Sequence, residues 1–146
     1  MLSFPVPVER LVPQRPPMLL LNRLLTFTQS EGTADAVIAP GNLFRLPDDT
    51  LHPAALIELM AQGYAVFHGY KDHLAGKPVG IGYLAGIQRA DVRGAARIGD
   101  RLLVIVRETA VIRPFYRAEA RVVRDGETLA AAELTLFNQP PGEPPS

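Results

Sequence analysis

The sequence contains no cysteine, and that absence excludes several kinds of chemistry together. Disulfide frameworks, thiolate nucleophiles and cysteine-ligated zinc sites all depend on this residue. Any reaction that the chain performs must therefore use histidine, carboxylates or backbone dipoles.

An excess of charge of one sign is also lacking, because 15 Lys and Arg balance 15 Asp and Glu. No overall field therefore steers the chain toward nucleic acid or an anionic membrane. No apolar run approaches the ~20 residues that a membrane span needs, and the first residues lack the pattern of a secretion signal. We expect a soluble cytoplasmic protein with neither nucleic acid nor a membrane as partner.

The length of 146 residues and a hydrophobic content of 47% are enough for one domain with a core of its own. Prolines gather at both ends of the chain. The last segment, "QPPGEPPS", has little to bury, and its prolines exclude a central strand or a helix interior. We expect a single domain over residues 1–138 and a Pro-rich tail over 139–146.

Hydrophobic periodicity predicts strands, one long helix, and then more strands. Alternation is clear in the later part of the chain, and Asp125-Gly126 is a strong hairpin signal. Short connections there favour antiparallel pairing. The expected strands cover residues 19–28, 32–39, 79–93, 101–112, 115–124 and 128–138, and the expected helix covers 51–74.

The expected helix is apolar around most of its circumference and rich in alanine and glycine. Such a helix is buried, and small residues let a sheet approach its backbone closely. One sheet can bury one helix only by curling around it. The prediction is an α+β fold in which a curved antiparallel sheet of about six strands wraps a long central helix.

Glu58 is a carboxylate in the mainly apolar first half of this helix. Burying a carboxylate is costly unless it is paired or has a task, so Glu58 is a candidate functional group. The alternative is a structural one, in which Glu58 pairs with an arginine where two subunits meet. His52 precedes the helix, and six helical residues turn ~600°, so the two side chains should lie on different faces.

Four segments resemble, in order, motifs of the hot-dog-fold β-hydroxyacyl-(acyl carrier protein) dehydratases. They are "LVPQRPPMLLLNRLL", "ALIELMAQ", "YLAGIQRADVRG" and "ARIGDRL". Each motif is weak alone, but their order and spacing make the resemblance specific, and it covers roughly Val8 to Asn138. The position of His52, close to the start of the helix, resembles that of the histidine in a subgroup of these proteins from aryl-polyene pathways.

The resemblance implies that two chains join their sheets into one, as a homodimer or a higher homo-oligomer, with acyl tunnels at the interface. It implies loss of water from a 3-hydroxyacyl thioester, giving the trans-2-enoyl thioester in fatty-acid or polyene-type biosynthesis. The acyl group would be carried by acyl carrier protein or coenzyme A. No metal and no organic cofactor are implied.

Residue by residue, the resemblance gives Glu58 the role of general acid, and His52 would be the base that takes the α-proton. Gln62 matches the glutamine of the helix motif and is expected to contact the substrate. The strand residues Leu84, Ala85, Gly86 and Ile87 are expected to line the tunnel together with apolar positions of the helix.

Two departures from the family pattern leave other interpretations open. The family's His-Phe-Pro-Gly loop would place its histidine where Phe44 stands, so His52 could instead be a residue that caps the helix. Pro53 replaces a glycine whose amide would polarise the thioester, so Ala54 or Ala55 must supply that donor, or the oxyanion site is absent. The alternatives are a hot-dog acyl thioesterase, in which Glu58 activates water, and a noncatalytic acyl-binding or partner subunit.

Overall fold

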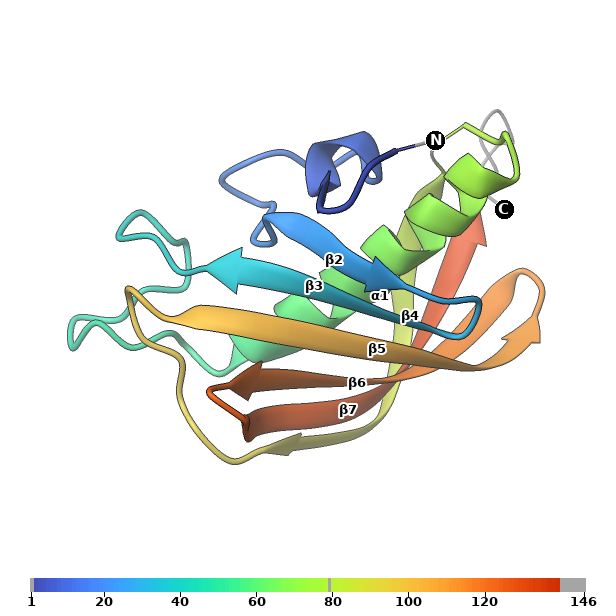
Figure 1. The fold of residues 1–146 in the computed structure, drawn as a ribbon. Helices are drawn as coiled ribbons and strands as arrows, with labels where there is room; N and C mark the ends of the chain where they lie inside the picture. Colours follow the sequence, from blue (N-terminus) through green and yellow to red (C-terminus); the bar gives the residue numbers. More distant parts are fainter. Residues whose placement is uncertain (1, 79, 140–146) are drawn as a thin grey trace.

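The computed structural model describes residues 2–78 and 80–139, in which one long helix lies against a curved antiparallel sheet (Figure 1). This arrangement confirms the α+β prediction. The helix is α1, Ala54–Leu74, and a short 3₁₀ helix covers Val8–Arg10. The strands are β1 Val6–Pro7, β2 Arg23–Phe27, β3 Glu31–Val37, β4 Ile81–Val92, β5 Arg101–Ile112, β6 Phe115–Arg124 and β7 Glu127–Gln139.

The described residues contain seven strands where about six were predicted, because Val6–Pro7 adds a two-residue strand at one end of the sheet. The bounds of β5 and β6 are those predicted, since alternating residues and short hairpin turns define them locally. β7 includes Gln139, the first residue of the expected tail, and the rest of that tail lies outside the described residues.

The helix begins three residues later than predicted. Thr50 and Leu51 are extended rather than helical, and they form isolated bridges with Arg97 and Arg45. The Leu51 amide donates to the carbonyl of Ala96 at 2.8 Å. Long-range backbone pairing therefore overrides the local helical pattern up to Pro53.

The sheet runs in the order β1-β2-β3-β5-β6-β7-β4, with every neighbouring pair antiparallel. β4 follows α1 in the chain but lies at the far end of the sheet, where it pairs with β7. Its other edge has no strand partner among residues 2–78 and 80–139. A twelve-residue edge strand therefore ends the sheet.

Glycines let α1 approach its neighbours closely, as the small residues of the helix predicted. A Cβ atom on Gly63 would lie 2.7 Å from Val104 Cγ1, so the helix backbone sits directly on β5. A Cβ atom on Gly69 would overlap the carbonyl oxygen of Leu11 in the segment before β2. The helix is thus packed between the sheet and the N-terminal segment.

Two buried carboxylates have partners. Asp35 on β3 accepts hydrogen bonds from Arg23 Nη2 at 2.6 Å and Arg101 Nη2 at 3.2 Å. Burial alone would raise the pKa of Asp35, but these two guanidinium groups outweigh it and hold the pKa below its ordinary value. Glu108 on β5 accepts from Tyr64 Oη at 2.7 Å and Lys71 Nζ at 2.8 Å, which ties α1 to the sheet.

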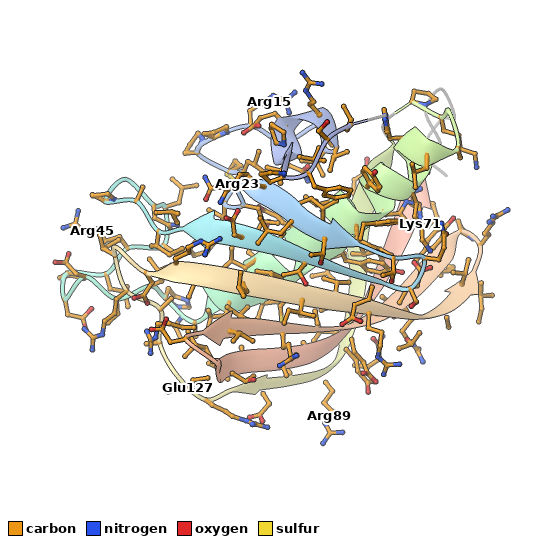
Figure 2. All side chains as sticks on the ribbon, in the orientation of Figure 1. Arg15, Arg23, Arg45, Lys71, Arg89 and Glu127 are labelled. Atoms are coloured by element: carbon orange, nitrogen blue, oxygen red, sulfur yellow. The ribbon has the colours of Figure 1, made fainter. Side chains whose placement is uncertain are left out.

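Figure 2 places the labelled Lys71 on the C-terminal half of α1, and Arg89 projects outward from the sheet. Within the described residues, α1 is not apolar enough over its length to cross a bilayer.

Candidate active site

The loop that leads into α1 is fixed by backbone hydrogen bonds on both sides of His52. The amide of His52 donates to the carbonyl of Phe44 at 2.8 Å, and the preceding residue is held by the carbonyl of Ala96. Phe44 occupies the position where the family pattern has its histidine. This position and His52 are therefore joined by a backbone hydrogen bond. The His52 side chain itself is exposed.

The imidazole of His52 caps the first helical amide. Its Nδ1 accepts the N–H of Ala54 at 3.0 Å, while its carbonyl accepts the N–H of Ala55 at 2.9 Å. The N–H of Leu56 donates to the carbonyl of Pro53 at 3.0 Å. The two amides that the sequence predicted as donors to the thioester therefore both have partners within the chain, and Pro53 has no N–H to offer.

The cap also fixes where the imidazole carries its proton. A ring nitrogen that accepts a hydrogen bond has its lone pair committed, so neutral His52 must carry its hydrogen on Nε2. The Nε2–H then faces away from the helix on an exposed side chain. The interpretation of His52 as a cap thus fits the structure, and it leaves one ring N–H available to a ligand.

Glu58 projects from the second turn of α1 and is partly exposed, not fully buried. Its Oε1 accepts a hydrogen bond from Gln62 Nε2 at 2.9 Å, one helical turn further on. Gln62 is itself only 3% exposed. The carboxylate therefore sits at the rim of the core, with one oxygen held and the other open.

Gln62 is fully engaged inside the chain. Its Oε1 accepts the N–H of Leu20 at 2.8 Å, and its Nε2 also donates to the carbonyl of Met18 at 2.7 Å. The side chain that the sequence assigned to substrate contact thus joins Glu58 to the segment before β2. Gln62 therefore positions the Glu58 carboxylate.

His52 lies before α1 and Glu58 lies in its second turn, so the helical spacing assumed for the two residues does not apply to this pair. Among residues 2–78 and 80–139, no hydrogen bond links the two side chains, since His52 bonds Ala54 and Glu58 bonds Gln62. One chain alone does not bring the pair together.

The β4 residues expected at the tunnel lie on the free edge of the sheet. Leu84 pairs with Leu136 and Ile87 with Leu134, and both partners are buried, so these side chains point to the α1 side. Yet Leu84 is 42% and Ile87 44% exposed. Ala85 falls in a bulge, and a Cβ atom on Gly86 would meet only Gln88 Nε2 at 3.2 Å. The edge therefore presents apolar side chains that this chain does not cover.

A hollow of about 460 Å³ lies elsewhere, on the sheet face away from α1. It is lined by both signs of charge and contains neither His52 nor Glu58. The ionic lining residues are Glu31, Asp91, Glu119 and Glu133 against Arg89, Arg93, Arg107 and Arg121. This balanced surface shows no reactive arrangement, so the helix start and the β4 edge remain the candidate site.

Comparison with known proteins finds similar chains and similar folds. The 3-hydroxyacyl-[acyl-carrier-protein] dehydratase FabZ of Bacillus thuringiensis (strain Al Hakam) is 29% identical over 134 residues, covering 88% of this chain and 91% of FabZ. The dehydratase heterocomplex ApeI:P from Xenorhabdus doucetiae has the same fold, with a TM-score of 0.86, 20% identity and 93% of each chain covered. The TT0310 protein from Thermus thermophilus is more distant, with a TM-score of 0.64, 19% identity, and coverage of 86% of this chain and 100% of that one.

The family comparison covers nearly the whole sequence. Residues 6–144 match the model of the ApeP-like family, described as ApeP dehydratase. This span includes the histidine that caps the helix, the carboxylate held by Gln62 and the edge strand β4. The chain belongs to the ApeP-like dehydratase family.

Proposed function

We propose that this protein catalyses the reversible loss of water from a 3-hydroxyacyl thioester on acyl carrier protein, giving the trans-2-enoyl thioester. The observation that carries the proposal is Glu58, a carboxylate held by Gln62 at the rim of the core, in the mainly apolar first half of α1. His52, with an exposed ring N–H, is the second reacting group. The FabZ relative is a dehydratase of this substrate class, which supports the choice of acyl carrier protein.

The proposed active unit is a homodimer joined along β4. The free strand edge supports this assembly, because unpaired backbone groups and exposed apolar side chains on an edge favour pairing with another chain. In such a dimer, His52 of one chain and Glu58 of the other form each site. A related but different hot-dog chain is the alternative occupant of that edge, an option suggested by the description of ApeI:P as a heterocomplex.

The acyl chain is proposed to run beside β4, on the α1 side of the sheet. Leu84 and Ile87 supply apolar contact there, while Ala85 and Gly86 leave room for a thin chain near the strand backbone. Replacing Gly86 with leucine should weaken the binding of long-chain acyl thioesters. The chain itself tolerates the change, because the only close atom is the end of the flexible Gln88 side chain.

The direct test is turnover with a 3-hydroxyacyl thioester, followed by the absorbance of the enoyl product and, separately, by a thiol reagent that detects hydrolysis. Glu58→Gln should reduce dehydration by about 10²–10⁴, the contribution typical of acid–base groups. Glu127→Gln, the same change at the exposed first residue of β7, is the matched control. Thiol release without enoyl formation would make the protein a thioesterase. A wild-type chain that binds acyl thioesters without turning them over would be a binding or partner subunit.

A further inference from the structure

We infer that His52 acts as a neutral hydrogen-bond donor to the thioester carbonyl, and that Glu58 is the base that removes the α-proton. This division of labour rests on the proposed dehydratase function and reverses the roles that the sequence pattern predicts. It follows from the hydrogen bonds around the two side chains. Each step uses groups of this chain and its proposed second copy, with no co-reactant.

The first argument concerns the lone pair of the imidazole. A histidine base needs a free nitrogen lone pair that faces the substrate. In His52, the lone pair belongs to Nδ1, which already accepts the N–H of Ala54 at 3.0 Å. The nitrogen that faces outward is Nε2, and it carries hydrogen. In this geometry His52 can donate to a substrate atom but cannot take a proton from one.

The second argument concerns what else could polarise the carbonyl. Pro53 has no N–H, the N–H of Ala55 donates to the His52 carbonyl, and the N–H of Leu56 donates to the Pro53 carbonyl. The helix start therefore presents no free amide in its first turn among these residues. His52 accepts a helix N–H at Nδ1 and offers its own N–H at Nε2. The ring therefore presents a hydrogen-bond donor at the positive end of the helix. The ring thus takes the place of the missing backbone donor.

The third argument concerns Glu58. Gln62 Nε2 donates to Oε1, and the glutamine cannot rotate away without losing the bonds to Met18 and Leu20. Oε2 is left to accept a proton, on a side chain that remains partly exposed in the single chain. A carboxylate with one oxygen fixed and one open is arranged as a base.

The proposed reaction balances with one base. Glu58 Oε2 takes the α-proton, and the electrons of the broken Cα–H bond move into an enolate whose oxygen accepts from His52 Nε2–H. The carbonyl then reforms, Cα and Cβ become doubly bonded, and the Cβ–O bond breaks. The departing hydroxyl takes the proton from Glu58 and leaves as water. Glu58 returns to the carboxylate, and His52 keeps its proton throughout.

The first experiment reads the tautomer directly. In ¹⁵N-histidine-labelled protein, long-range ¹H–¹⁵N NMR distinguishes protonated from unprotonated ring nitrogens, and the three histidines are few enough to assign with single substitutions. At a pH where His52 is neutral, we expect hydrogen on Nε2 and a bare Nδ1. Hydrogen on Nδ1 with a bare Nε2 would overturn the inference.

The second experiment compares a substitution that keeps a donor at the position of Nε2–H with one that keeps only the acceptor at the position of Nδ1. In His52→Gln, the terminal amide N–H takes the position of Nε2–H, so turnover should stay within about tenfold of wild type. In His52→Asn, the shorter side chain still caps the Ala54 amide but offers no donor there, so turnover should fall by about 10²–10³. Thermal melting confirms that each variant folds.

Equal losses in the glutamine and asparagine variants would return His52 to the role of base and overturn the inference, while wild-type dehydration would still support the proposed function. A wild-type chain without dehydratase activity would overturn both. The two failures are thus distinguishable in one set of assays.

Discussion

Gln62 joins Glu58 to Met18 and Leu20, which lie more than forty positions before Gln62 in the chain. Its Nε2 donates to Glu58 Oε1 at 2.9 Å and to the Met18 carbonyl at 2.7 Å, and its Oε1 accepts the Leu20 N–H at 2.8 Å. One buried amide therefore sets both the orientation of the carboxylate and the position of the segment before β2.

Replacing Gln62 with methionine should affect stability and activity together. The change keeps the volume but leaves the Leu20 N–H and the Met18 carbonyl without partners, at a cost of about 1–3 kcal/mol. Glu58 also loses its fixed oxygen, so kcat should fall about tenfold or more while KM changes less. Urea unfolding and steady-state kinetics measure the two effects. Loss of stability with unchanged kcat would show that Gln62 is structural only.

Asp35→Asn should destabilise the fold in a pH-dependent way. The wild-type carboxylate accepts charged hydrogen bonds from Arg23 and Arg101, and losing such bonds costs about 1–3 kcal/mol. The pKa of folded Asp35 lies below its ordinary value of 3.8, so the unfolded chain binds its proton first as the pH falls. The stabilisation is therefore full above about pH 4 and is lost as the pH falls through the folded pKa.

Urea unfolding of wild type and Asp35→Asn from pH 7 to pH 3 checks this prediction. The difference in unfolding free energy should be largest near neutrality and should shrink in acid. Asp91→Asn is the control, because Asp91 pairs with Arg93 on the surface, where ion pairs contribute little. A constant difference across the pH range would contradict the account.

Much of the fold could be predicted because its signals are local. Alternation and tight turns defined β5 and β6 to the residue, and the apolar circumference of residues 54–74 identified the central helix. The helix start was misplaced because Thr50 and Leu51 pair with distant backbone at Arg97 and Arg45. A two-residue strand at Val6–Pro7 is too short to leave a periodic signal.

The sequence singled out the candidate site residues but could not give the hydrogen bonds around them. The helix motif singled out Glu58, while its contact with Gln62 was readable from the four-residue spacing alone. The hydrogen bonds of Gln62 with Met18 and Leu20 could not be predicted, because they depend on how the N-terminal segment packs on α1. The His52 cap on Ala54 likewise depends on the extended backbone that precedes Pro53.

Gly69→Ala should destabilise the protein although alanine normally favours a helix. The new Cβ atom would overlap the backbone of Leu11, which can move only by displacing the N-terminal segment. We expect a net loss of about 1–3 kcal/mol from overpacking, in spite of the ~1 kcal/mol that alanine gains over glycine in a helix. Gly41→Ala is the control, since its Cβ would meet nothing within 4 Å. Thermal melting of both variants decides the matter, and equal melting temperatures would argue against the close packing.

Ile87→Glu should weaken the proposed dimer without unfolding the chain. Ile87 is exposed on the β4 edge, so a charge there costs little in the single chain but would be buried, and doubled by symmetry, between two chains. We expect the dimer dissociation constant to rise at least tenfold, measured by light scattering across a concentration series. Val37→Glu, the same kind of change at an exposed position of β3, should leave association unaltered. If both variants associate like wild type, the contact between chains lies away from β4.

The free edge of β4 also affects the tendency of the chain to aggregate before it assembles. A newly made chain displays a twelve-residue strand whose outer backbone groups, together with Leu84 and Ile87, are open to any extended peptide nearby. Soluble yield should therefore depend on how quickly a partner arrives. Slow or dilute expression would leave this strand as a template for aggregation, and supplying a matching subunit from the same transcript would shorten the exposure.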